Sequence, residues 1–230
     1  MKKFKFFIAL DLKSNTQNIS IVKKLYNHVY GFKVGYRSFY NKRSDELISE
    51  IKKKKSKLFL DLKLHDIPNT VSKSLANICN LGVWMSNIHL LGGREMIEEA
   101  SSTVKKINSE MILVGVTILT SLNENNLIEL GFKSSSEAIA LNLAQLGKEN
   151  SIDGVVCSIE DISGIKALLG SDFLSVTPGV RMLQENDDQK RSGSIYDAIK
   201  FGSDYVVIGR EITQAKDPEG VLKKIESLIV

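Results

Sequence analysis

Three charged side chains lie close together in the stretch 61–70, which reads Asp-Leu-Lys-Leu-His-Asp-Ile-Pro-Asn-Thr. Asp61 and Lys63 are two residues apart, so on an extended strand they share one face and place a carboxylate beside an ammonium group. A neighbouring carboxylate favours the protonated form of a lysine. The spacing therefore predicts that Lys63 donates a proton, because a Schiff-base lysine would need the free amine.

Apolar residues frame these charges and argue against the alternative, a solvated surface loop. Leu60, Leu62 and Leu64 alternate with the charged positions, and Ile67 follows them. Large apolar side chains at this density are typical of a strand that packs in a core. Pro68 suits the first turn of a helix, where its missing N–H would be unpaired in any case. The stretch is therefore predicted to be a strand, a charged turn and a helix start.

The rest of the chain repeats this alternation of strand and helix. Each apolar segment is followed by helix signals, for example the candidate caps Asn123 and Ser135 or Ser136, and Asp-Pro-Glu at 217–219. Eight such units predict a (β/α)₈ TIM barrel, with an open doubly wound sheet as the alternative. Since no linker interrupts them, we expect one catalytic domain over residues 1–230. The predicted strands are 5–10, 31–35, 58–62, 85–90, 112–118, 154–158, 173–177 and 205–208.

Further charges lie near the ends of the first two predicted strands, where TIM barrels place their active sites. Asp11 follows the first strand, and Lys33 lies in the second. Either residue alone has a plain structural explanation, as a turn former or as a surface lysine. Buried charges are costly unless they are paired, however. We therefore expect Asp11, Lys33, Asp61 and Lys63 to converge as an alternating set of acids and bases.

Two loops that combine glycine with arginine follow the seventh and eighth predicted strands. One is Thr-Pro-Gly-Val-Arg at 177–181, and the other is Gly-Arg at 209–210. Loops at these two positions of a TIM barrel commonly bind phosphate through backbone N–H groups, and arginine adds a forked donor. One such loop alone is more often an ordinary turn. The pair predicts a phosphate site that includes Pro178, Arg181, Gly209 and Arg210.

Composition argues against several kinds of site and partner. The chain is 43% hydrophobic and 25% charged, as in average globular proteins, and its net charge of +4 does not demand a nucleic acid. We interpret the basic run 52–55 as the solvated end of a helix-like segment over 51–57. Because Asp11 soon interrupts the N-terminal apolar run and no cleavage site follows, we expect no export signal and no membrane partner.

Histidines and cysteines show no spacing that is typical of a metal site. Cys79 and Cys157 are isolated, and neither His65 nor His89 is spaced for metal binding with a second ligand. We therefore assign no metal, and we interpret both cysteines as reduced thiols of a cytoplasmic protein.

These residues together resemble the orotidine 5'-phosphate decarboxylase family, along essentially the whole chain. The most specific part is the stretch 61–70. It is supported by Asp11, Lys33, Thr120 within Thr-Ile-Leu-Thr-Ser, the 177–181 loop, Gln189 and the Gly209-Arg210 pair.

The resemblance implies a cofactor-free decarboxylation of orotidine 5'-monophosphate to uridine 5'-monophosphate in de novo pyrimidine biosynthesis. Lys63 would protonate the pyrimidine carbon that loses carbon dioxide, and Asp61 would lie near the departing carboxylate. The family forms homodimers with shared active sites, so Asp66 and Thr70 would reach into the partner's site. The resemblance also implies that Asp11 and Lys33 bind ribose hydroxyls, that Thr120 contacts the base, and that Arg181, Gln189 and Arg210 bind the phosphate.

Two departures from the family pattern leave local packing open. Leu90 and Leu91 stand before the Gly-Gly pair at 92–93, where small residues are usual, and Ser-Ile at 194–195 replaces a Thr-Pro helix start. Two other functions remain as alternatives. One is a magnesium-dependent sugar-phosphate decarboxylase of the same superfamily, which shares the Asp-x-Lys-x-x-Asp pattern, and the other is a noncatalytic nucleotide-phosphate binding protein.

Overall fold

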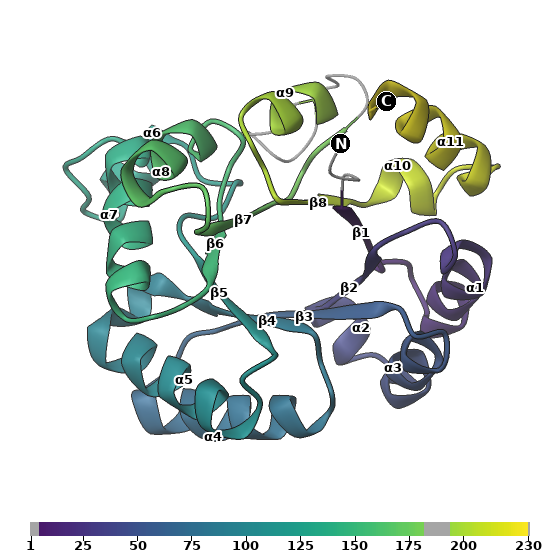
Figure 1. Ribbon diagram of the computed structural model, residues 1–230, viewed down its shortest axis with the longest axis horizontal. Helices are drawn as coiled ribbons and strands as arrows, with labels where there is room; N and C mark the ends of the chain where they lie inside the picture. Colours follow the sequence, from purple (N-terminus) through teal and green to yellow (C-terminus); the bar gives the residue numbers. More distant parts are fainter. Residues whose placement is uncertain (1–4, 182–193, 230) are drawn as a thin grey trace.

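Eight parallel strands form a closed barrel in the computed structural model of the chain, which describes residues 5–181 and 194–229 (Figure 1). Each strand pairs with the next along the chain, and the last pairs with the first. The predicted TIM barrel is therefore confirmed, and the open doubly wound sheet is wrong. The strands are β1 (Lys5–Ala9), β2 (Gly31–Gly35), β3 (Lys57–Leu64), β4 (Met85–His89), β5 (Ile112–Val116), β6 (Gly154–Val156), β7 (Leu174–Thr177) and β8 (Tyr205–Ile208).

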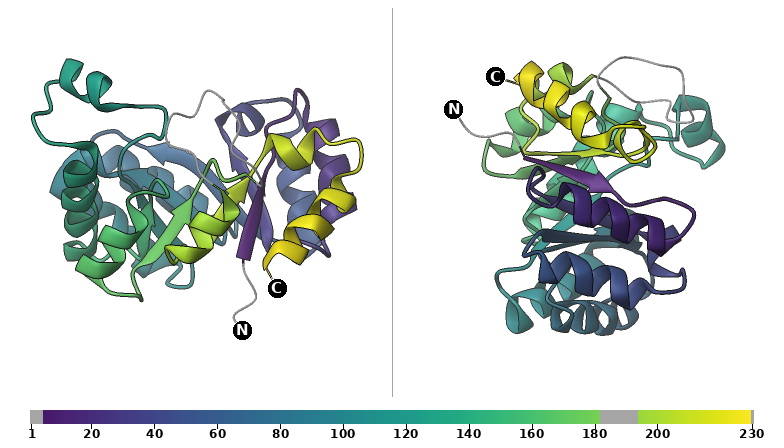
Figure 2. Two further views of the ribbon diagram at one scale, coloured as in Figure 1. Left: turned by 90° about the horizontal axis from the view of Figure 1, so that it is seen from above. Right: turned by 90° about the vertical axis from the view of Figure 1, so that its right-hand side faces the viewer.

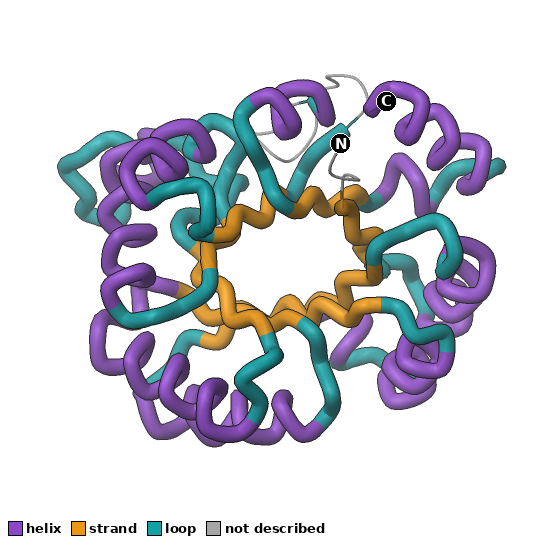
Figure 3. Tube along the Cα trace, viewed as in Figure 1, coloured by secondary structure: helices purple, strands orange, loops and turns teal. Residues whose placement is uncertain are grey.

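Helices surround the barrel as an outer ring (Figure 3). In the left view of Figure 2, the short helix α6, coloured teal, projects beyond the strands. The helices are α1 (Asn15–Leu25), α2 (Tyr36–Phe39), α3 (Ser44–Lys53), α4 (Pro68–Asn80), the 3₁₀ turn η1 (Leu90–Gly92), α5 (Gly93–Ile107), α6 (Glu124–Glu129), α7 (Ser136–Glu149), α8 (Ile162–Leu169), α9 (Ile195–Lys200), α10 (Arg210–Thr213) and α11 (Pro218–Ile229). None of the helices over 5–181 and 194–229 is long and apolar enough to cross a membrane.

Strand boundaries differ from the predicted ones where burial continues past the strand. The fifth strand was expected to reach Ile118, which is buried although the strand ends at Val116. Apolar composition reports burial, whereas a strand also needs ladder hydrogen bonds. The expected helix-like segment 51–57 is shorter, because α3 ends at Lys53 and Lys57 already begins β3. A left-handed Lys55 (φ 55°) makes the turn between them.

Helix starts follow the predicted signals. Asn123 caps α6, Ser135 caps α7, and Pro68 opens α4. The departure at 194–195 also gives a proper helix start, because Ser194 forms a capping box with Asp197 at the beginning of α9. Local sequence therefore determines where these helices begin.

Two apolar layers hold the barrel. One lies between strands and helices, and it includes Leu58, Leu60 and Leu62 of β3. The other fills the interior with Phe7 of β1, Phe59 of β3 and side chains from β4 to β8. An aromatic cluster of Phe7, Tyr30, Trp84 and Tyr205 lies at the N-terminal end of the barrel, where Phe7 stacks on Trp84 and the other ring pairs meet edge to face or tilted. Apolar side chains therefore fill the interior at the N-terminal end of the barrel, and polar groups gather at its C-terminal end.

Candidate active site

A cavity of about 870 Å³ opens at the C-terminal ends of the strands. This is where active sites of TIM barrels lie. The predicted site residues that line it are Asp11, Lys33, Asp61, Lys63, Thr120, Pro178, Arg181, Gly209 and Arg210. Residues from six different strands and the loops that follow them thus meet in one place, as the sequence predicted.

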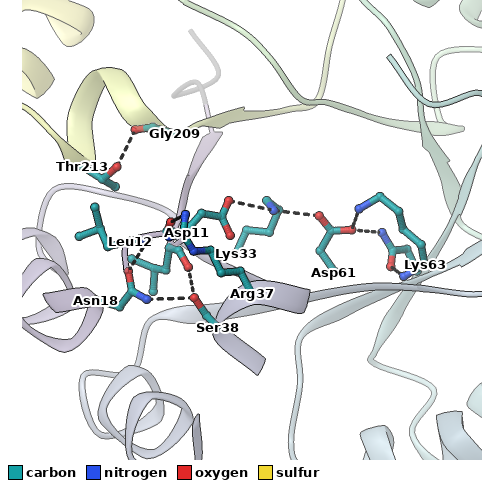
Figure 4. A network of polar contacts seen from close by, with 12 residues as sticks. Asp11, Leu12, Asn18, Lys33, Arg37, Ser38, Asp61, Lys63, Gly209 and Thr213 are labelled. Atoms are coloured by element: carbon teal, nitrogen blue, oxygen red, sulfur yellow. Dashed lines mark hydrogen bonds and ion pairs between the residues drawn. The ribbon is translucent and has the colours of Figure 1, made fainter. Parts of the chain in front are cut away.

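Asp11, Lys33, Asp61 and Lys63 form one alternating row of charges, which we call the charged row (Figure 4). The Lys33 Nζ lies 3.8 Å from a carboxylate oxygen of Asp11 and 2.9 Å from one of Asp61. The other Asp61 oxygen lies 2.5 Å from the Lys63 Nζ. Asp61 and Lys33 are largely buried, whereas Asp11 is half-exposed. The two middle residues of the row are therefore buried, and its two ends, Asp11 and Lys63, are more exposed.

Pairing keeps the centre of the charged row ionised. Burial by itself raises the pKa of Asp61, but the ammonium groups of Lys33 and Lys63 outweigh burial and hold that pKa well below its usual range. Burial likewise lowers the pKa of Lys33, and the carboxylates of Asp61 and Asp11 raise it by more. Both groups therefore carry their full charge at neutral pH.

Lys63 does not simply continue the strand. Its φ of 42° lies in the left-handed region, and the pairing of β3 with β4 shifts register between Leu60 and Leu64. The Lys63 N–H donates to the side chain of Asn87 on β4 (2.7 Å). The two-residue alternation predicted that Asp61 and Lys63 share a face, and it missed both this bulge and Asn87. The available signal for Asn87 was a polar amide within a segment that was predicted to be a strand, and all five residues of that strand, β4, are buried.

A second group that the sequence analysis missed holds the loop that carries Asp11. Asn18 accepts from the Leu12 N–H (3.2 Å) and donates to the Ser38 hydroxyl (2.9 Å), which in turn donates to the Leu10 carbonyl (Figure 4). Asn18 and Ser38 are completely buried. Arg37 of α2 adds a hydrogen bond to the Asp11 carbonyl (3.1 Å). These bonds tie the end of β1 to α2 and fix the outer end of the charged row.

The two glycine-and-arginine loops lie together on the wall of the cavity beside β7 and β8. Gly179 has a φ of 73°, a conformation that side chains disfavour, so glycine allows this turn between Pro178 and Arg181. Gly209 precedes α10, which begins at Arg210. The two guanidinium groups give the wall two cationic side chains, while the carboxylates of the charged row lie toward β1 and β3.

Asp66 and Thr70 do not line the cavity. Both are exposed near the start of α4, and the Asp66 carboxylate accepts from the Ile67 N–H (2.7 Å). Gln189 lies outside the described residues. In the part of the chain that the structure describes, no three His, Cys, Asp or Glu side chains are grouped so that they could hold a metal ion.

His65 and His89 stack on each other, with ring centroids 5.3 Å apart. His89 ends β4 and is buried, and its Nδ1 accepts from the Leu91 N–H (3.4 Å). Burial, together with His65 and Lys63, lowers the pKa of His89 to about 4. The imidazole is therefore neutral at neutral pH.

We expect His89 to make the fold less stable in weak acid. The unfolded chain binds a proton on this histidine near pH 6.5, but the folded chain does so only near about 4. The free energy of unfolding therefore falls as pH drops through this window, by up to about 3 kcal/mol at about 1.4 kcal/mol per pKa unit. Urea unfolding at several pH values measures the slope. His89→Asn should flatten it, and the same change at the exposed His28 should not. An unchanged slope in His89→Asn would contradict this assignment.

Comparison with known proteins agrees with the site. The model of the orotidine 5'-phosphate decarboxylase / HUMPS family matches residues 5–225. The orotidine 5'-phosphate decarboxylase of Syntrophus aciditrophicus is 41% identical over 222 residues, which cover 93% of this chain and 88% of the relative. That of Carboxydothermus hydrogenoformans is 41% identical over 218 residues, covering 93% and 90%.

A solved structure shows the same similarity in three dimensions. The crystal structure of orotidine 5'-phosphate decarboxylase from Lactobacillus acidophilus superimposes with a TM-score of 0.84 at 33% identity, over 98% of both chains. A family match over nearly the whole chain, together with relatives of this identity, is sufficient to assign the family. The chain belongs to the orotidine 5'-phosphate decarboxylase / HUMPS family.

Proposed function

We propose that this chain is a carboxy-lyase that converts orotidine 5'-monophosphate to uridine 5'-monophosphate in pyrimidine biosynthesis. Relatives that are 41% identical carry the name orotidine 5'-phosphate decarboxylase. The observation that carries the proposal is the charged row, which brings the Lys63 side chain, held by Asp61, into a cavity that is also lined by two arginines. An anionic nucleotide fits this distribution of charge.

Lys63 is the proton donor in this proposal. The bond between the pyrimidine ring and its carboxylate breaks, carbon dioxide leaves, and the electron pair stays on the ring carbon. The Lys63 ammonium stabilises this developing carbanion and then transfers a proton to it, after which water restores the ammonium. Asp61, whose carboxylate lies 2.5 Å from the Lys63 Nζ, orients the lysine side chain and lies near the departing carboxylate. No cofactor is needed for these steps.

The remaining cavity residues bind the parts of the nucleotide that do not react. Asp11 and Lys33 contact the ribose hydroxyls, Thr120 contacts the base, and the phosphate lies between the loops of Pro178 and Arg181 and of Gly209 and Arg210, with Gln189 as a further ligand. All of these except Gln189, which lies outside the described residues, line the cavity. Binding energy from a distant phosphate raises the rate when it is realised in orienting the reacting ring.

The test is turnover of orotidine 5'-monophosphate by the purified chain in excess chelator, followed by the loss of substrate absorbance. We expect full activity, unchanged by added magnesium. Activity that appears only with magnesium, and on a sugar phosphate, would favour the magnesium-dependent alternative. Binding of the nucleotide without turnover would favour a noncatalytic protein.

We also propose that the active enzyme is a homodimer with shared sites. Asp66 and Thr70 are exposed beside Ile67, an apolar side chain that is 64% exposed. Leu91, in the 3₁₀ turn η1 between β4 and α5, is a second exposed apolar side chain. Apolar surface of this kind is typical of a face that a partner covers. In such a dimer Asp66 and Thr70 complete the partner's cavity.

Mixed dimers test the sharing of sites. Lys63→Ala and Asp66→Ala should each be nearly inactive alone, because every site then lacks one group. When subunits exchange, a mixed dimer has one site with both defects and one with neither, so up to about a quarter of the wild-type activity returns in an equal mixture. A tagged subunit that co-purifies with its untagged partner shows that exchange took place. No recovery after proven exchange would argue against shared sites.

Residues 1–230 form a single catalytic domain in this proposal, which acts in the cytoplasm without nucleic-acid or membrane partners. The family match spans 5–225, almost the whole chain. Cys79 and Cys157 are buried and form no disulfide, which suits a reducing compartment. Fractionation of the source cells tests the location.

A further inference from the structure

The bulge in β3 leaves a gap in the ladder beside the charged row. Phe59 pairs with Met85 and Leu60 with Ser86, but the next pair is Leu64 with Ile88. Asp61, Leu62 and Lys63 therefore face the single residue Asn87. Within this gap the Lys63 backbone is left-handed. Such a conformation is strained for a lysine, and it persists only where the surroundings fix it.

The Asn87 carboxamide fills the gap. Its Oδ1 accepts from the Lys63 N–H (2.7 Å), and its Nδ2 donates to the Asp61 carboxylate (2.7 Å). The same Asp61 oxygen accepts from the Lys63 Nζ (2.5 Å). Asn87 thus joins the backbone of Lys63 to the carboxylate that holds the Lys63 side chain. Only this orientation of the amide satisfies both partners, because one is a donor and the other is an acceptor.

Burial makes this arrangement rigid. Asn87 is completely buried on β4, and it does not line the cavity. Its two hydrogen bonds are therefore not in competition with water. We propose that Asn87 is a positioning residue: it fixes the left-handed turn at Lys63 and the Asp61 carboxylate together, so that the Lys63 ammonium points at the reacting carbon. This inference rests on the proposed decarboxylation.

The neutrality of the amide is part of the proposal. A carboxylate at position 87 would face the Asp61 carboxylate at hydrogen-bond distance, and two such groups cannot both be ionised without strong repulsion. In its protonated form the same side chain would again offer one donor and one acceptor in the right places. Asn87→Asp should therefore work only when it carries a proton. A purely structural asparagine would not give this pH dependence.

Three variants test the proposal in the decarboxylation assay. Asn87→Leu should lower kcat by about 10²-fold with KM changed little, because misplacement of a catalytic group of this order costs that much. Asn87→Asp should lose activity at alkaline pH and recover it relative to wild type as the pH falls. Ser86→Ala is the matched control: Ser86 is also buried on β4, and its hydroxyl donates to the Leu60 carbonyl (3.1 Å) and not to a side chain of the charged row. It should keep wild-type kcat.

A second readout does not depend on turnover. The Lys63 amide proton should exchange slowly with solvent in the wild type and much faster in Asn87→Leu, while amides of β1 stay protected if the barrel remains folded. The inference is overturned if Asn87→Leu keeps kcat within about threefold, if the loss in Asn87→Asp does not vary with pH, or if Lys63 exchange is unchanged. An inactive wild type would instead overturn the proposed function, and the exchange measurement would then decide on Asn87 alone.

Discussion

Lys63→Ala should lower the rate of decarboxylation by at least about 10⁴-fold. In the proposed mechanism, the change removes the proton donor and also the cation that stabilises negative charge on the ring carbon. Both effects act mainly in the transition state, so kcat should fall far more than KM rises. The barrel should remain folded, because Lys63 lies at the end of β3 and its side chain reaches into the cavity. Steady-state kinetics with orotidine 5'-monophosphate measure the effect.

Lys57→Ala is a suitable control for this variant. Lys57 begins the same strand at the opposite end of the barrel and is exposed, so its loss removes a positive charge without touching the charged row. It should keep nearly wild-type kcat. Lys63→Arg adds a second comparison, because it keeps the charge but holds its proton too tightly to donate it. More than about a tenth of the wild-type rate in Lys63→Ala would overturn the role of proton donor.

Asp61→Ala should lower both the rate of decarboxylation and the free energy of unfolding. Asp61 is buried between two ammonium groups, at 2.9 Å from Lys33 and 2.5 Å from Lys63. Without it, Lys33 stays buried with only the half-exposed Asp11 at 3.8 Å. Removing one partner of a buried ion pair costs about 3–5 kcal/mol, because the other charge loses its compensation. We expect the activity to fall by about 10³-fold as well, because Lys63 loses the group that orients it.

Urea unfolding and steady-state kinetics at neutral pH check this second expectation. Asp172→Ala serves as the control, since Asp172 is an exposed aspartate on a loop. The pH dependence gives a further test. Because the pKa of Asp61 is held below its usual value of 3.8, its contribution to stability is complete above that pH and is lost only in stronger acid. A stable Asp61→Ala variant with native activity would show that the charged row has no role.

The order of the elements could be predicted from the sequence because each element depends on its own residues. Apolar segments and caps such as Asn123 and Ser135 act over a few residues, and they gave eight strands and the helix starts correctly. Closure of eight such units into a barrel then brings every strand end to one face. The charged residues lie in or just after three neighbouring strands, β1, β2 and β3. This explains why Asp11, Lys33, Asp61 and Lys63 were expected to meet, and all four line one cavity.

What only the tertiary structure decided is how these side chains are held. The bulge at Lys63, the Asn87 bridge and the buried pair of Asn18 and Ser38 all join residues from different elements. Their positions depend on the register between neighbouring strands and on the packing of α1 and α2, which no local pattern of residues records. The sequence by itself thus determined which charges reach the mouth of the barrel. The folded chain determined their distances and partners, because hydrogen bonds between elements form only once the barrel has closed.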